Sequence, residues 1–293
     1  MGQVMIPTVK ILYDVTVYRL RRLEMANLFG SLSIMLALHL KWDDVIIRII
    51  FCYLLNVLIY LNNDYCNVEH DLRAPKKDGL KAAYLRSHMR TAFAVQIILF
   101  MLLVAIGLIW SYGLVVALVA GVGICSIYSC KLKQVPYADI IVAFFGGMGI
   151  LMVSFPLDKA LGWLLACQLA LFAVCFQLVQ TIRDYSEDSV LGVRTTAVQL
   201  GIPRAKIVLY VVEILAAGYA VLVLNRWFGL MMFGVLALSL GPKNVVGYWN
   251  RARMIMGSVW LMILAWIYWI GSSHGLLLSV DNSAIVNSLT WIR

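Results

Sequence analysis

The chain has 293 residues, of which 62% are hydrophobic and only 13% are charged, and its mean hydropathy is +0.88. A soluble protein keeps roughly a quarter of its residues charged, so this composition excludes an ordinary soluble enzyme and predicts an integral membrane protein. The formal net charge of +9 does not favour nucleic acid, because the basic residues lie between apolar stretches, where they orient a membrane protein. We therefore expect the lipid bilayer, and no nucleic acid, among its partners.

The first 23 residues contain no apolar core ahead of their arginines, which is not the pattern of a cleavable signal peptide. A spanning helix needs about 20 apolar residues, and no linker is long enough to separate two soluble domains. We expect residues 1–293 to form a single all-α, polytopic membrane domain. Nine candidate spans cover residues 25–41, 45–63, 91–110, 112–129, 138–156, 161–182, 206–224, 228–241 and 255–273.

Positive charge alternates along the chain. The N-terminal segment and the connections after the second, fourth, sixth and eighth predicted spans hold 19 of the 24 lysine and arginine residues. Loops rich in lysine and arginine stay on the cytoplasmic side of a membrane. This pattern predicts a cytoplasmic N-terminus and, with nine spans, a C-terminus on the other side.

An acidic stretch, residues 63–71 (NDYCNVEHD), directly follows the second predicted span. If this segment is helical, Asn63, Asn67 and Asp71 share one face at i, i+4, i+8 spacing, with Asp64 beside them. A run of basic residues follows at once. Oxygen ligands beside cations are what a metal-bridged polyphosphate requires.

A second acidic cluster, residues 184–188 (DYSED), follows the sixth predicted span, and a basic and hydroxyl-bearing run, residues 192–196 (GVRTT), comes next. The topology places both acidic clusters on the cytoplasmic side. Two carboxylate faces closing on one site repel each other unless cations lie between them, and Mg²⁺ suits that role. A single acid at a helix end is usually an ordinary interfacial residue, but two such clusters, each followed by basic residues, favour a functional site.

A third polar stretch, residues 128–133 (YSCKLK), follows the fourth predicted span on the same side. Tyr128 could hydrogen-bond to a phosphate and Lys133 could reach one, although an interfacial tyrosine with snorkelling lysines has the same pattern. Most of the six cysteines lie in apolar runs and no CxxC pair occurs, so neither a zinc site nor a disulfide framework is expected.

Together these features resemble the UbiA superfamily of intramembrane prenyltransferases. Residues 63–71 are similar to the NDxxDxxxD motif of that family, and residues 184–188 to its DxxxD motif, with residues 192–196 matching the run that follows. Residues 128–133 are similar to its YSxxLK motif. Nine predicted spans, with the motifs after the second, fourth and sixth, complete the resemblance, which covers most of the chain.

The resemblance implies a bundle of nine transmembrane helices around a central cavity, in which two Mg²⁺ ions bridge an isoprenyl diphosphate to both acidic motifs. Carried over by position, the catalytic residues would be Asp64, Asp71, Asp184 and Asp188. The metal ligands would be these four aspartates with Asn63 and Asn67. The diphosphate would be held by Arg22, Arg73, Lys77, Tyr128, Lys133 and Arg194.

Two positions depart from the family pattern. Asn67 replaces the middle aspartate of the first motif, and its carbonyl oxygen can bind Mg²⁺ but brings no charge, so metal binding would be weaker or altered in geometry. Leu23 stands where the family commonly has a proline after the arginine of the first helix. Both departures suggest a specialised member of the family.

The resemblance implies Mg²⁺-assisted ionisation of the diphosphate to an allylic carbocation, which a small acceptor, typically an aromatic ring, attacks in a cavity that excludes water. The leading hypothesis is therefore an aromatic prenyltransferase of the UbiA type. The alternative is a terpene cyclase of the same superfamily, which would convert a substrate such as farnesyl diphosphate to a cyclic terpene without an acceptor. A transporter or channel is disfavoured, because its acids would line a path in mid-helix.

Overall fold

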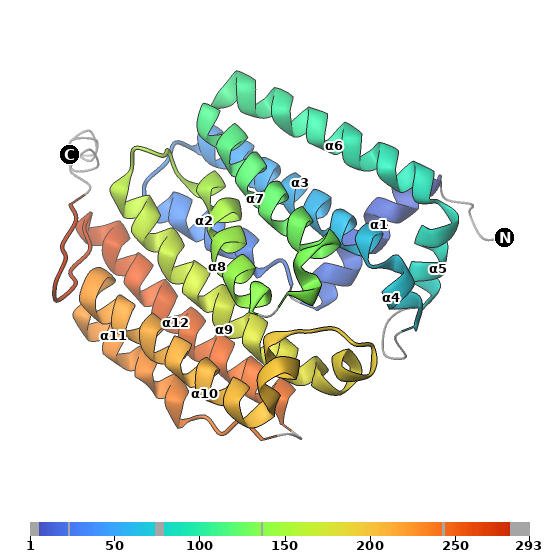
Figure 1. The fold of residues 1–293 in the computed structure, drawn as a ribbon. Helices are drawn as coiled ribbons and strands as arrows, with labels where there is room; N and C mark the ends of the chain where they lie inside the picture. The colour runs from blue at the N-terminus through green and yellow to red at the C-terminus, as the bar shows by residue number, and fades with distance from the viewer. Residues whose placement is uncertain (1–5, 23, 74–78, 136, 242–243, 282–293) are drawn as a thin grey trace.

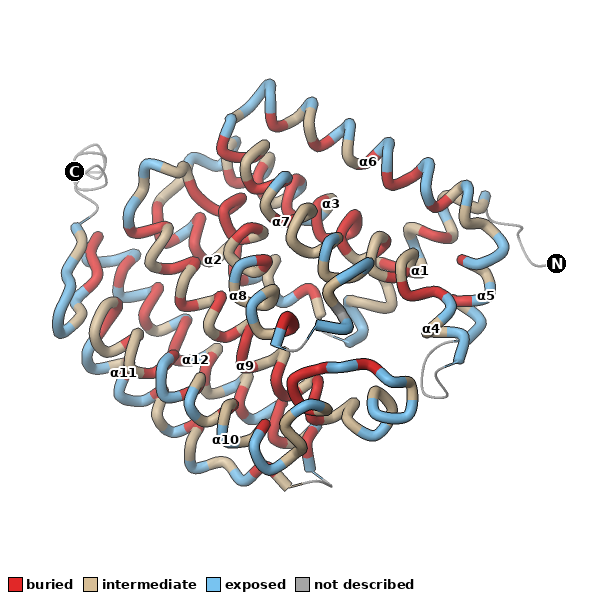
Figure 2. The backbone as a smooth tube through the Cα atoms, viewed as in Figure 1, coloured by how far each residue is buried: buried red, intermediate tan, exposed pale blue. Residues whose placement is uncertain are grey.

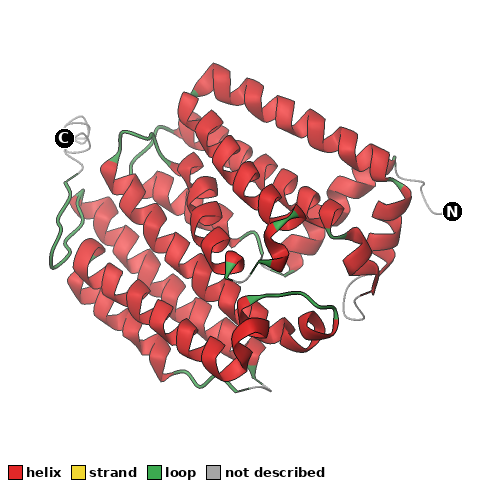
Figure 3. Ribbon diagram, viewed as in Figure 1, coloured by secondary structure: helices red, strands yellow, loops and turns green. Residues whose placement is uncertain are grey.

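A computed structural model describes residues 6–22, 24–73, 79–135, 137–241 and 244–281. Within these ranges the regular structure is helical, as Figure 3 shows, and the only β-type pairings are two isolated bridges, Asn225 to His274 and Ser272 to Asp281. The all-helical class predicted from the sequence is therefore confirmed.

The apolar helices fall on the nine predicted stretches. Six of those described are long and apolar enough to cross a bilayer: α3 (Trp42–Cys66), α6 (Met89–Trp110), α7 (Tyr112–Cys130), α9 (Ala160–Val190), α10 (Thr196–Tyr219) with its continuation Ala220–Leu224, and α12 (Val245–Ile270). Three shorter apolar segments match the remaining stretches: α2 (Ala26–Ala37), α8 (Ala138–Leu151) with Met152–Ser154, and α11 (Arg226–Met232) with Phe233–Ala237. These helices are those of an integral, multi-pass membrane protein, while the count of nine crossings stays a prediction.

The long helices pack side by side around a continuous apolar core. On α3 the side chains of Phe51, Leu55 and Leu61 are fully buried, because α2, α6 and α7 all pack against this helix. On the outer helices, apolar side chains such as Ile98 and Ile109 of α6 remain exposed, and Figure 2 shows this outward exposure along α6. A helix that is apolar on its packed face and on its open face is suited to lipid.

Three short helices lie together beside the ends of α3 and α6 (Figure 1): α1 (Pro7–Arg21), α4 (Val68–Arg73) and α5 (Gly79–Ser87). Pro7 begins α1. Proline is favoured in the first turn of a helix because backbone N–H groups there have no acceptor within the helix, so the lack of an N–H costs no hydrogen bond. The last turn of α1 carries Arg19 and Arg21, and Arg22 follows at its C-cap. This group of helices, which the apolar spans alone did not predict, forms most of the wall of the candidate site.

Candidate functional site

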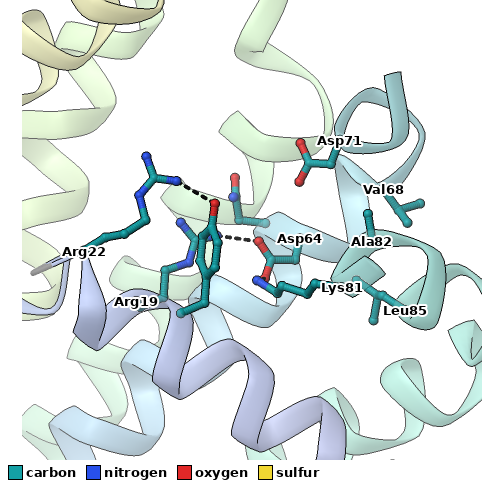
Figure 4. A pocket seen from close by; sticks show the side chains of 10 residues that line it. Arg19, Arg22, Asp64, Val68, Asp71, Lys81, Ala82 and Leu85 are labelled. Atoms are coloured by element: carbon teal, nitrogen blue, oxygen red, sulfur yellow. Dashed lines mark hydrogen bonds and ion pairs between the residues drawn. The ribbon is translucent and has the colours of Figure 1, made fainter. Parts of the chain in front are cut away.

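A small polar pocket, here called the Asp64 pocket, lies where α1, the end of α3, α4 and α5 meet (Figure 4). It brings together four residues that the sequence analysis predicted for one site, Arg22, Asn63, Asp64 and Asp71. The complete lining is Tyr18, Arg19, Arg22, Asn63, Asp64, Val68, Asp71, Lys81, Ala82 and Leu85.

The first acidic stretch reaches this pocket through a break between two helices. Asn63 and Asp64 lie in the last turn of α3, and Asp71 lies in α4, which begins after Asn67. The amide of Asn67 donates to the backbone oxygen of Asn63 (2.7 Å) and to its side-chain oxygen (3.1 Å). Asn67 is buried and does not line the Asp64 pocket. The predicted shared face is therefore only partly present: Asn67 caps α3, and its role as a metal ligand stays a prediction.

Asp64 is the most enclosed acid of the pocket, at 4% exposure. One carboxylate oxygen accepts a hydrogen bond from Nη2 of Arg19, and the other accepts one from Nζ of Lys81 (2.6 Å). Figure 4 shows Arg19 arriving from α1 and Lys81 from α5. Arg22 was predicted from the sequence, but neither of these two cations was. Arg19 lies one helical turn before Arg22, and Lys81 belongs to the basic run after the acidic stretch.

Arg19 connects Asp64 to a second carboxylate, that of Glu24. Its Nη1 donates to Oε2 of Glu24 (2.5 Å), and its guanidinium lies over the Tyr60 ring, 4.7 Å from the centroid. Burial by itself lowers the pKa of Arg19, but Asp64 and Glu24 outweigh this effect and hold that pKa above its ordinary value. The guanidinium is thus a fixed positive charge. Arg22 completes the cluster, since its Nε lies 3.0 Å from Oε1 of Glu24.

The second acidic motif lies on the last turns of α9, outside the lining of the Asp64 pocket as the described residues define it. Arg183 donates to both carboxylate oxygens of Asp184, at 2.8 and 2.7 Å. The hydrogen bond to Asp184 raises the pKa of Arg183, and the negative charge of Glu24, which acts on this guanidinium through its electric field, helps to raise it. Among the described residues, the carboxylates of the two motifs do not gather into one group of three or more.

The third stretch is attached directly to the first. Ser129 donates from Oγ to the side-chain oxygen of Asn63 (3.2 Å), and Cys130 forms a disulfide with Cys66. Of the other predicted phosphate-binding residues, Arg73 is exposed at the end of α4 and Arg194 is exposed between α9 and α10. Lys133 lies on the short 3-10 turn Leu132–Gln134, but its side chain and the whole of Lys77 fall outside the described residues.

The Cys66–Cys130 disulfide corrects the expectation that the chain has no disulfide framework. The absence of a CxxC pair says nothing about cysteines that tertiary packing brings together. Here α3 and α7 pack side by side, and their ends place the two Cα atoms 5.4 Å apart, within the usual range for a disulfide.

We expect this disulfide to be present in protein purified without reductant. Alkylation under denaturing conditions, followed by peptide mass spectrometry, should recover the Cys66 and Cys130 peptides as a linked pair. The four cysteines that are free in the structure, Cys52, Cys125, Cys167 and Cys175, serve as the internal control and should be alkylated. Finding Cys66 and Cys130 alkylated as well would contradict the pairing.

A buried acid that was not predicted as a site residue, Asp139, connects the start of α8 to the start of α10. Asp139 is 3% exposed, and its carboxylate accepts hydrogen bonds from the backbone N–H (3.1 Å) and the hydroxyl (2.5 Å) of Thr196. A carboxylate at the N-terminus of a helix satisfies free N–H groups and complements the helix dipole. Asp139 therefore attaches the start of α10, where the run of residues 192–196 ends, to α8. The sequence did contain one signal for Asp139, because an acidic residue at the start of an apolar span usually has a specific role.

The donor set of the Asp64 pocket fits Mg²⁺. Among the described residues, no three histidine, cysteine, aspartate or glutamate side chains are close enough to bind a metal by themselves. Mg²⁺ does not require such a cage, because it commonly binds one or two carboxylates and completes its shell with water and substrate phosphates. Asp64, Asp71 and the carboxamide of Asn63 supply oxygens of that kind from one pocket.

The fold and the pocket define a helical membrane protein with carboxylates and cations concentrated at helix ends. A sequence model of the UbiA prenyltransferase family matches residues 26–253, and the chain belongs to this family. A sequence search found no match among curated proteins. The fold is similar to that of a UbiA homolog from Archaeoglobus fulgidus bound to GPP and Mg²⁺, with a TM-score of 0.58 and 14% identity over 90% of this chain and 98% of that chain. At this identity the likeness shows the fold alone.

Proposed function

We propose that the protein transfers an isoprenyl group from an isoprenyl diphosphate to a small acceptor within the membrane, in an Mg²⁺-dependent reaction. The observation that carries this proposal is the Asp64 pocket, where Asn63, Asp64 and Asp71 face Arg19, Arg22 and Lys81 in a chain of the UbiA family. The structural neighbour that binds GPP and Mg²⁺ supports the same substrate class and metal.

The residues divide into two roles. Asn63, Asp64 and Asp71 of the first motif, with Asp184 and Asp188 of the second, would hold Mg²⁺, which when bound offsets the charge that accumulates on the departing diphosphate. Arg19, Arg22 and Lys81 face the pocket and would stabilise the same negative charge. Further contacts to the diphosphate would come from Arg73, Lys77, Tyr128, Lys133 and Arg194.

The apolar environment would govern the fate of the carbocation. Val68, Ala82 and Leu85 form the apolar side of the pocket, and the long helices that pack next to it, such as α3 and α6, are largely apolar. Such walls exclude water and protect a reactive intermediate from hydrolysis. The isoprenoid chain would extend away from the polar residues, between apolar helices.

The same pocket would serve a UbiA-type terpene cyclase, in which a double bond of the substrate attacks the carbocation. The departures from the family pattern at Leu23 and Asn67 are the features that favour this second candidate. An aromatic prenyltransferase needs an acceptor and a cyclase does not, so the two differ in a directly measurable way.

Product analysis tests both candidates. The purified protein is incubated with farnesyl or geranyl diphosphate and Mg²⁺, first alone and then with a panel of small aromatic acceptors, and the organic extract is examined by mass spectrometry. Prenylated acceptor is the expected product, and an EDTA-treated sample is the control. A cyclic hydrocarbon or alcohol formed without acceptor would establish the cyclase instead. Absence of any Mg²⁺-dependent product under both conditions would contradict the proposal.

A further inference from the structure

Both carboxylate oxygens of Asp64 are already engaged by cations. Arg19 donates to one oxygen from Nη2, and Lys81 donates to the other from Nζ at 2.6 Å. All three side chains are largely enclosed, with side-chain exposures of 12% for Arg19, 13% for Lys81 and 5% for Asp64. A divalent cation that binds Asp64 would therefore compete with these two cations for the carboxylate oxygens.

Displacing a buried cation is costly unless it keeps another counter-ion. Arg19 has one, because its two terminal nitrogens bond to different acids: Nη2 to Asp64 and Nη1 to Glu24, at 2.5 Å. The planar guanidinium is suited to such two-sided bonding. If Asp64 turns to a metal ion, Glu24 still neutralises Arg19.

Glu24 is itself held in place by the chain around it. The hydroxyl of Tyr60 on α3 donates to the backbone oxygen of Glu24 (2.5 Å), and the backbone N–H of Glu24 donates to the backbone oxygen of Arg19 (3.0 Å). Oε1 of Glu24 lies 3.0 Å from Nε of Arg22. Both carboxylate oxygens thus face guanidinium groups, which makes Glu24 unsuited to accept a proton from substrate and suited to hold arginines.

We propose that Glu24 is a positioning residue that retains Arg19 in the pocket when Asp64 exchanges its arginine for Mg²⁺. This inference rests on the proposed function, because it takes Asp64 as a metal ligand. Nη2 of Arg19 would then be available to a diphosphate oxygen, while Nη1 would keep its bond to Glu24. Among the described residues, Glu24 is the second carboxylate to which Arg19 donates a hydrogen bond.

The proposal predicts opposite effects of neutralising the two partners. With Glu24→Gln, Asp64 becomes the only carboxylate bonded to Arg19, so Arg19 competes more strongly with the metal. With Arg19→Gln, that competitor is removed. In the double variant the loss of Glu24 should have no further effect, because Glu24 acts through Arg19.

The test is an Mn²⁺ titration of the detergent-purified protein without substrate, followed by electron paramagnetic resonance of the free ion. We expect Glu24→Gln to raise the Mn²⁺ dissociation constant by roughly tenfold, on the scale of one buried charge pair. Arg19→Gln should lower it, and the double variant should match Arg19→Gln. Asp14→Asn is the matched control, since Asp14 lies on the same segment but pairs with Lys10 (2.9 Å) and should leave the constant unchanged.

Circular dichroism and gel filtration establish that each variant is folded. Glu24→Asp keeps the charge and should retain much of the wild-type affinity. This variant keeps the test possible if Glu24→Gln proves unstable. Mn²⁺ affinity that is equal in wild type, Glu24→Gln and Glu24→Asp would overturn the role of Glu24 while leaving the metal site intact. Failure of the wild-type protein to bind Mn²⁺ would overturn the metal site itself, and with it this inference.

Discussion

Replacing Asp64 by asparagine is expected to lower the turnover of an isoprenyl diphosphate by about a thousandfold, the scale seen when a preorganised charge-stabilising group is lost. The carboxamide has nearly the same shape but cannot bring a negative charge to Mg²⁺. It also leaves Arg19 and Lys81 with one fewer counter-ion. The measurement is the steady-state rate of product formation by purified protein at saturating Mg²⁺.

One control variant and one variant of the second motif accompany this experiment. Asp158→Asn changes an exposed aspartate before α9, remote in sequence from all three motifs, and should keep wild-type turnover. Asp184→Ala should also abolish turnover, since it removes the first aspartate of the second motif. Wild-type rates in a correctly folded Asp64→Asn protein would remove the first motif from the proposed metal site.

The largest expected effect on stability belongs to Asp139. In Asp139→Ala the N–H and the hydroxyl of Thr196, which is itself fully buried, lose their acceptors. Leaving buried donors without partners costs about 1–3 kcal/mol each, so we expect a clearly lower thermal midpoint by gel filtration of heated samples. Turnover should fall as well, because the run of residues 192–196, which includes Arg194, loses its attachment to α8.

A graded series tests this account of Asp139. Asp139→Asn keeps one acceptor oxygen and should lose less stability than Asp139→Ala, while Thr196→Ser keeps both donors and should lose least. Equal stability of Asp139→Ala and wild type would contradict a supporting role for the buried carboxylate.

The apolar stretches predicted most of the fold, because hydropathy is a local property of the chain. The sequence positions of α3 and α7 follow directly from their composition. The short helices α1, α4 and α5 were not predicted, because they are neither long nor apolar. The end of α3 before Asn67 was also not predicted. An asparagine that caps a helix and an asparagine inside a continuing helix cannot be told apart by their spacing in the sequence.

The candidate site was predicted in part, and the division has a physical reason. Asn63, Asp64 and Asp71 carry oxygen ligands in one short stretch, so the sequence reveals them together. The partners of Asp64 do not come from that stretch: Arg19 lies 45 positions away and Lys81 lies 17 positions away. Only the packing of α1 and α5 against the end of α3 makes them neighbours. The same holds for Asp139 with Thr196 and for Cys66 with Cys130.

The central claim is that the Asp64 pocket binds an isoprenyl diphosphate together with Mg²⁺. The most direct measurement is isothermal titration calorimetry of the purified protein with a thio analogue of geranyl diphosphate that resists ionisation, with Mg²⁺ or with EDTA. We expect saturable binding with Mg²⁺, strong loss of affinity with EDTA, and similar loss in Asp64→Asn. Binding that is unchanged by EDTA and by Asp64→Asn would contradict the claim.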